Sequence, residues 1–188
     1  MKEHDDFLRE YGFSKEVQEA FSSMGQIIEI KKGEKLLHQG NVCLFVALIV
    51  SGRFRIYHDF DGKESTIGLS FDFFITDYSS FVTGKPSEVN IVALVDSKLL
   101  LFQKTEIEMF FDFNKETQCF GRKIAEQIMV SNQNALFSLL YDSAEDRYKK
   151  LIKQHPHLLQ LFSLKDIAEC IGVTPETVSR IRKKILYS

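Results

Sequence analysis

The stretch from residue 164 to residue 184 constrains the fold more than any other part of the sequence. Apolar residues in its first half recur at spacings of three and four, which indicates one buried face of a short helix. Gly172 follows where that helix must end, because glycine adopts the left-handed conformation without a steric penalty. Thr174 and Pro175 then suit the N-cap and the first position of a second helix. The apolar positions of the first helix are Leu164, Ile167, Ala168 and Ile171.

The second helix of this pair has an apolar side and a polar, basic side. Val178, Ile181 and Ile185 recur at helical spacing, so we expect them to pack against the first helix. Polar side chains at the start of such a helix can meet base edges in the major groove, where arginine pairs with guanine and glutamate with cytosine. The sequence therefore predicts a helix-turn-helix that binds double-stranded DNA, with a pair of ordinary surface helices as the alternative. The predicted DNA contacts are Thr174, Pro175, Glu176, Thr177, Ser179, Arg180, Arg182 and Lys183.

Charge is distributed unevenly along the chain. The 188 residues carry a net charge of −2, whereas the second helix holds a cluster of cationic side chains. A local basic patch on a slightly acidic protein favours specific over indiscriminate DNA binding. No stretch approaches the roughly 20 apolar residues of a membrane span, and the charged N-terminus lacks the apolar segment of a secretory signal. We therefore expect a cytoplasmic protein without a membrane partner.

The cysteines and histidines do not form a recognisable metal or disulfide pattern. The three cysteines are scattered and contain no CxxC pair, which favours a reducing compartment over a disulfide framework or a zinc site. His155 and His157 flank a proline, and without a third ligand at a suitable spacing we interpret them as a surface turn. The sequence therefore predicts no metal site.

Between residues 26 and 103 the pattern changes to short runs rich in β-branched and aromatic residues. Turns that contain glycine separate these runs at intervals of roughly ten residues, which is typical of a sandwich, barrel or jelly roll. One or two short amphipathic helices are expected before them, over residues 7–24. The predicted strands are 27–30, 36–37, 44–50, 54–57, 65–69, 71–75, 89–95 and 99–102.

A long helix is predicted over residues 115–140, after the β-region. One stripe of this helix is apolar apart from Ser131, and such a stripe can form the seam of a two-stranded coiled coil. Because the helix is longer than one small domain usually covers, we expect it to pair with a second copy of the chain; packing on its own β-domain is the alternative. The predicted seam residues are Phe120, Ile124, Ile128, Ala135 and Leu139.

A break follows at residues 141–145, and a further helix is predicted over residues 146–154. The chain is thereby divided into three parts: an effector domain at 1–114, a dimerisation helix at 115–140 and a DNA-binding domain at 141–188. This division predicts an α+β protein in which a β-domain precedes a helical DNA-binding unit.

This order of elements resembles the cyclic-AMP receptor protein and fumarate–nitrate regulator (Crp/Fnr) family of bacterial transcription factors. Local matches are the turns at 32–34 and 61–64, and the most specific match is the helix-turn-helix at 166–180. The resemblance implies a jelly-roll, cyclic-nucleotide-binding-like domain (a double-stranded β-helix), a dimerisation helix and a winged helix-turn-helix. It also implies that Glu176 and Arg180 contact bases, and that the partners are DNA, a second copy and RNA polymerase.

Two further expectations follow from this resemblance. The protein is expected to be a transcription regulator and not an enzyme. Because the sequence stops soon after the second helix of the helix-turn-helix, any strand of the family's wing should come from residues 158–163.

The segment that binds the cyclic phosphate in this family departs from the family pattern. The family's glycine and glutamate fall on Thr76 and Asp77, and its arginine and following small hydroxyl residue fall on Ser87 and Glu88. Without the arginine there is no bidentate clamp for a phosphate, and Lys85 nearby is a poorer substitute. These five residues are the candidate ligand pocket, and we expect an unknown effector, or none, in place of cyclic AMP. The cysteine and histidine patterns of iron–sulfur and haem sensors are also missing.

A cupin-like enzyme or small-molecule-binding protein with a helical tail is the second interpretation of the β-region. Cupin metal sites place histidines and a carboxylate at tight spacing within their strands. Here His38 and His58 stand apart, and the β-region contains no His-x-His pair. The sequence therefore favours the DNA-binding regulator.

Overall fold

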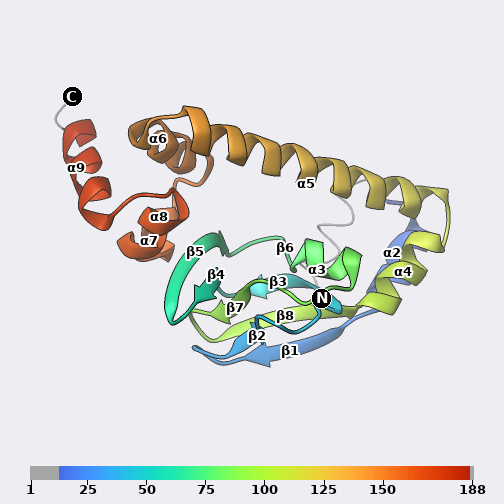
Figure 1. Ribbon diagram of the computed structural model, residues 1–188. Coiled ribbons are helices and arrows are strands. Elements are labelled where there is room, and N and C mark those ends of the chain that lie inside the picture. The colour runs from blue at the N-terminus through green and yellow to red at the C-terminus, as the bar shows by residue number, and fades with distance from the viewer. Residues whose placement is uncertain (1–12, 187–188) are drawn as a thin grey trace.

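Two four-stranded antiparallel sheets face each other and form the β-domain of the computed structural model, which describes residues 13–186 (Figure 1). The strand order is β1-β8-β3-β6 in one sheet and β2-β7-β4-β5 in the other. Apart from the β4–β5 hairpin, successive strands alternate between the two sheets, which confirms the predicted jelly roll. The strands are β1 Gln26–Ile30, β2 Lys35–Leu37, β3 Phe45–Ser51, β4 Phe54–Phe60, β5 Lys63–Ser70, β6 Phe74–Ile75, β7 Asn90–Ala93 and β8 Ser97–Gln103.

The space between the sheets is filled by the inward-facing side chains of these strands. Phe54, Ile91 and Leu99 are completely buried there. The hairpin between β4 and β5 turns at Asp61 and Gly62, whose φ angles of 50° and 80° suit a two-residue turn with positive φ at both positions. Each predicted strand is present in whole or in part, because runs of β-branched and aromatic residues between glycine-containing turns mark the same elements.

Two predicted strands, 71–75 and 89–95, are shorter than expected, and one helix within the β-region was not predicted. Of residues 71–75, β6 keeps the last two, because Phe73 has a φ of 65° and leaves the extended conformation. Helix α3, Tyr78–Thr83, lies in the stretch before β7. Asp77 caps it by accepting a hydrogen bond from the backbone N–H of Ser80 at 3.3 Å. With six residues, α3 is too short to show a helical period in the sequence.

Helices at one end of the β-domain build a second core that is rich in phenylalanine. These are α2, Lys15–Ser22, and α4, Lys104–Asp112 (Figure 1). The ring of Phe21 lies 4.7 Å from that of Phe102 and 5.3 Å from that of Phe110. Phe7, Leu8 and Tyr11, in the first part of the predicted N-terminal helices, lie outside the described residues.

Helix α5, Lys115–Tyr141, confirms the predicted long helix and runs across the β-domain (Figure 1). The first apolar residues of this helix pack on the β-domain of the same chain. Phe120 is buried in the phenylalanine-rich core, and Ile124 packs against that core. This placement corrects the expectation that these two residues lie on a seam with a second copy. The side of the helix that the β-domain covers depends on the shape of that domain, which the spacing of apolar residues along the helix does not reveal.

Four helices follow at the far end of α5. The extended Asp142 and the N-cap Ser143 interrupt the helix where a break was predicted. The segment expected to supply a wing strand instead contains helix α7, because Leu158 and Phe162, four residues apart, bury together. Between α6 and α9 the described residues contain no strand. The helices are α6 Ala144–Gln154, α7 Leu158–Leu161, α8 Leu164–Cys170 and α9 Pro175–Leu186. None of the helices in residues 13–186 is long and apolar enough to cross a membrane.

Candidate nucleic-acid interface and effector cavity

Helices α8 and α9 form a helix-turn-helix around a small buried core. Ala168 and Val178 are completely buried between them, whereas Ile167 is completely buried on the other side of α8, with Leu158 and Phe162. Gly172 has a φ of 70° in the turn, which confirms the left-handed position predicted for it. The hydroxyl of Thr174 accepts a hydrogen bond from the backbone N–H of Thr177 at 3.3 Å and so caps α9 as predicted. Local chemistry alone therefore determines the geometry of this motif.

The side of α9 that points away from this core is exposed and basic. Arg180, Arg182 and Lys183 are exposed, and within residues 13–186 none of the three forms an ion pair with a carboxylate. The predicted contact residues Pro175, Thr177 and Ser179 are partly exposed. The neighbouring Lys184 differs, because its Nζ lies 2.6 Å from the carboxylate of Glu145 and forms an ion pair between α9 and α6. The predicted DNA-contacting residues therefore lie together at the start and along the outer side of α9.

Glu176 is the acidic residue of this surface, and it is held ionised. Its own backbone N–H and the hydroxyl of Thr174 donate hydrogen bonds to its carboxylate, and these lower its pKa below the usual value. An ionised carboxylate in the first turn also suits the positive end of the helix dipole. Glu176 can therefore accept a hydrogen bond from an exocyclic amine at neutral pH.

Helix α8 also contacts the β4–β5 hairpin through a group of charged residues. Arg55 on β4 lies 2.6 Å from Glu64, 3.4 Å from Glu169 and 3.5 Å from Asp166. The carboxylate of Glu169 also accepts hydrogen bonds from the backbone N–H of Thr66 at 3.2 Å and from its hydroxyl at 2.5 Å. We call these five residues the Arg55 cluster. Sequence reasoning missed the cluster because its members lie about a hundred residues apart.

The hydrogen bonds of the Arg55 cluster outweigh the effect of burial on Glu169. Burial alone would raise the pKa of this carboxyl, but the two donors of Thr66 and the charges of Arg55 and Lys165 lower its pKa below the usual value. The ionised form is therefore the one that the contact stabilises. Beside the cluster, Arg53 donates a hydrogen bond to the carbonyl oxygen of Leu161 at 2.5 Å.

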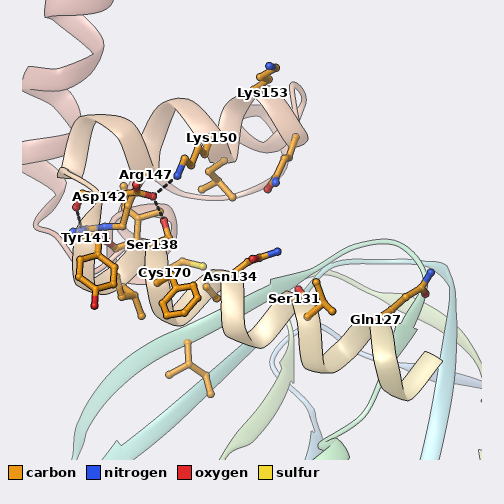
Figure 2. Close-up of a pocket in the computed structure, with 18 of the residues that line it drawn as sticks. Gln127, Ser131, Asn134, Ser138, Tyr141, Asp142, Arg147, Lys150, Lys153 and Cys170 are labelled. Carbon is orange, nitrogen blue, oxygen red and sulfur yellow. Dashed lines mark hydrogen bonds and ion pairs between the residues drawn. The ribbon is translucent and has the colours of Figure 1, made fainter. Parts of the chain in front are cut away.

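An open cavity of about 1360 Å³ lies between α5, α6 and α8, and Figure 2 shows residues that line it. Its cationic side chains at the junction of α5 and α6 already have partners. Lys150 lies 2.6 Å from the carboxylate of Asp142, and Arg147 donates to the carbonyl oxygens of Asp142 and Ile171 at 2.7 and 2.8 Å. These bonds set the angle between the long helix and the helix-turn-helix, so the cavity is part of a junction.

A second cavity, of about 650 Å³, lies between the β-domain and the inner side of α5. Of the five residues predicted to form a ligand pocket, Thr76 and Asp77 line it. Lys85 and Glu88 are exposed and do not line it. Ser87 is buried elsewhere, and its hydroxyl bonds to the backbone N–H and carbonyl oxygen of Val89. The structure therefore does not bring the predicted pocket residues together.

The histidines weighed for a metal or haem site lie at separate places. His58 is hydrogen bonded through Nδ1 to the carbonyl oxygen of Glu88 at 2.6 Å. His155 packs edge-on against the ring of Phe71 at 5.6 Å. Among the residues that the structure describes, no three or more histidine, cysteine, aspartate or glutamate side chains form a group that could hold a metal ion.

Comparison with known proteins agrees with this architecture. The sequence model of the cyclic nucleotide-binding domain matches residues 27–114. The structure of FixK2 from Bradyrhizobium japonicum is similar over 87% of this chain and 85% of its own, with a TM-score of 0.75 and 16% identity. The chain has the Crp/Fnr fold. A search of curated proteins found no match.

Two further Crp/Fnr-like structures extend the similarity to most of the chain. A CooA variant from Carboxydothermus hydrogenoformans has a TM-score of 0.70 at 17% identity, with 97% of this chain and 83% of that one covered. A protein of the Crp/Fnr family from Eubacterium rectale has a TM-score of 0.66 at 16% identity, with 94% and 85% covered. At such identities the similarity establishes the fold, which confirms the resemblance drawn from the order of elements.

The fold family implies a cyclic nucleotide, and the residues of this cavity do not fit one. Among the described residues that line it there is no lysine, arginine or histidine. The N-terminus of α3, which could otherwise attract a phosphate, is already capped by the carboxylate of Asp77. An anionic phosphate would therefore meet a like charge and no cation.

Proposed function

We propose that this protein is a transcription regulator of the Crp/Fnr type that binds a specific DNA sequence through α9 and acts as a homodimer. The observation that carries the proposal is the exposed outer side of α9, where Glu176 and Arg180 are one helical turn apart and exposed. Side chains with this spacing on one side of a helix can reach neighbouring base pairs in a major groove. The Crp/Fnr fold around this motif supports the same function.

Homodimerisation is supported by the second half of α5. Met129 and Leu136 are 67% and 54% exposed, and Leu139 and Leu140 are 54% and 63% exposed. A coiled-coil seam requires residues at alternating spacings of four and three. The stripe that follows this spacing consists of Ala125, Met129, Asn132, Leu136 and Leu139. We propose this stripe as the seam with a second copy. It keeps Leu139 from the predicted stripe. Of the others, Phe120 and Ile124 pack on the β-domain, Ile128 lines the cavity between that domain and α5, and Ala135 is exposed beside the new stripe.

The proposal is tested by selecting bound duplexes from a random pool with the full chain. Two half-sites related by a dyad and about 34 Å apart are expected, since each copy would place one α9 in the major groove. Recovery of no enriched sequence would overturn the DNA-binding proposal. An enriched sequence without dyad symmetry would overturn the symmetric dimer.

Variants on the selected site then test the base contacts. Arg180→Ala should lose about 1–3 kcal/mol of binding and accept more sequences at one position, because it removes a bidentate contact to a base. Lys183→Ala should weaken binding to all sequences equally if it contacts phosphates. Lys123→Ala, which removes an exposed cation on α5, serves as the control. Unchanged discrimination by Arg180→Ala would contradict its role.

A further inference from the structure

We propose that the cavity between the β-domain and the inner side of α5 binds a small, uncharged and mainly apolar molecule. The regulatory part of this inference, that the molecule acts on DNA binding, rests on the proposed function. The binding part rests on the cavity alone. The cavity has a volume of about 650 Å³, within the range of about 300–1,000 Å³ that is usual for small-molecule sites.

The lining of the cavity is apolar and has no positive charge. Side chains from β4, β5, β6, α3, α4 and α5 contribute to it, and Asp77 is the charged member among the described residues. Transfer of an anion into such surroundings removes its hydration without providing a counter-charge. The cavity is therefore unsuited to nucleotides, carboxylates and other anions. The apolar side chains include Ile56, Phe74, Phe81, Phe111, Ile124 and Ile128.

The mouth of the cavity exposes apolar side chains that a ligand would cover. Ile67, Phe73 and Tyr78 line the cavity and are 58%, 42% and 37% exposed. Phe73 also has a φ of 65°, which is unfavourable for a bulky residue, and its carbonyl oxygen accepts a hydrogen bond from the backbone N–H of Ile49 at 3.0 Å. Strain at a ligand-facing residue is common in binding sites, and burial of these side chains would contribute to binding.

Helix α5 adds polar groups to the lining, beside those of Ser70, Thr76, Asp77 and Ser79. Gln127 and Ser131 line the cavity and offer hydrogen bonds to a hydroxyl, carbonyl or amide group. This placement explains why Ser131 interrupts the apolar stripe of the long helix. Because the same helix leads to the helix-turn-helix, a molecule held between it and the β-domain contacts both parts.

The binding part is tested with two probes of the same shape and different charge. N-phenyl-1-naphthylamine is neutral, whereas 1-anilinonaphthalene-8-sulfonate carries the same rings and a sulfonate. We expect the neutral probe to bind saturably with one molecule per chain and a rise in fluorescence. The sulfonate and cyclic AMP should bind at least about tenfold more weakly, because the cavity has no counter-charge. Equal binding of both probes, or no saturable binding of the neutral one, would overturn the proposal.

Three variants locate the probe. Ser131→Trp places an indole at the cavity and should abolish binding of the neutral probe. Gln133→Trp adds the same group at an exposed position on the opposite side of α5 and should leave binding unchanged. Asp77→Asn keeps an N-cap for α3 while removing the charge, so it should strengthen binding of the sulfonate and leave the neutral probe unaffected. Equal loss of the neutral probe in both tryptophan variants would place it elsewhere and overturn the assignment.

DNA binding with and without the neutral probe separates the two parts of the inference. A change in affinity for the selected duplex in the wild-type chain, absent from Ser131→Trp, is the expected result. Saturable probe binding with no effect on DNA affinity would overturn the regulatory part and keep the ligand site. Failure of the chain to select any DNA would overturn the proposed function while leaving the probe results intact.

Discussion

Two contacts of the C-terminal half of the chain with the β-domain differ in chemistry. At the start of α5, the ring of Phe120 lies 4.8 Å from that of Phe13 within a buried aromatic core. At α8, the Arg55 cluster on the β4–β5 hairpin adds ion pairs and hydrogen bonds to an apolar contact of Leu158, Phe162 and Ile167 with Leu69, Phe71 and Leu94. The first contact excludes water, whereas the charged side chains of the second are 12% to 43% exposed.

This difference determines how each contact responds to a change in conditions. The free energy gained by burying apolar surface does not depend on the exact orientation of the groups or on pH. It amounts to about 1.5–3 kcal/mol for a side chain of this size. The strength of an ion pair depends on the geometry and protonation of its two groups and on the salt concentration. Its net contribution to stability is small once the cost of desolvation is included. The start of α5 is therefore held by apolar packing, whereas the contact of the helix-turn-helix with the β-domain includes a charged part that responds to pH and salt.

Removal of the aromatic anchor should have the largest effect. Phe120→Ala is expected to lower the free energy of unfolding by about 3–5 kcal/mol, because it leaves a cavity in a packed core. Urea unfolding followed by circular dichroism measures the change. Val82→Ala, at an apolar residue that is 56% exposed on α3, is the control and should change little. Equal stability of the two variants would show that the start of α5 is not anchored by this core.

Breaking the Arg55 cluster should have a smaller and more local effect. Arg55→Ala leaves three carboxylates without their cation, and a loss of about 1–3 kcal/mol is expected. Hydrogen exchange should accelerate in α8 and remain unchanged in β1 and β8. Arg122→Ala removes an arginine whose ion pair with Glu126 is 61% and 57% exposed, and it should alter neither quantity. Uniform acceleration over the whole chain would contradict a local contact.

Acid should loosen the α8 contact before it affects the aromatic core. The pKa of Glu169 is lowered in the folded protein from its usual 4.5. Its contribution is therefore fully present above pH 4.5 and is lost as the pH falls through the lower folded value. Energy transfer between labels on the β-domain and α9, followed from about pH 6 to about pH 3, measures this change. Glu64 and Asp166 keep their ion pairs with Arg55 in Glu169→Gln, so this variant should reduce the pH dependence without breaking the whole cluster. An unaltered dependence in this variant would contradict the assignment.

An exposed ion pair should have the smallest effect. Lys31 lies 3.1 Å from Asp96, and their side chains are 68% and 65% exposed. Lys31→Ala is expected to leave the melting temperature unchanged, because water already screens such a pair. A decrease as large as that of Arg55→Ala would show that exposure does not separate the two kinds of ion pair.

The parts of this fold that could be predicted from sequence are those governed by local chemistry. The turn at Gly172, the cap at Thr174 and the strands between glycine turns depend on neighbouring residues. The Arg55 cluster could not be predicted, because the contact of Thr66 with Glu169 joins positions 103 residues apart. The side of α5 that meets the β-domain depends in the same way on distant aromatic residues. The lining of the cavity was missed for this reason too.

The long helix α5 also acts as a lever. Beyond Phe120 it continues to Tyr141, a length of about 30 Å at 1.5 Å per residue. A tilt of about 5° at the anchored end would therefore carry the other end about 3 Å. Hydrogen bonds such as those from Thr66 to Glu169 do not persist through a displacement of that size. A change at the cavity too small to disturb the β-domain is thus large enough, at the far end, to break the hydrogen bonds of the Arg55 cluster.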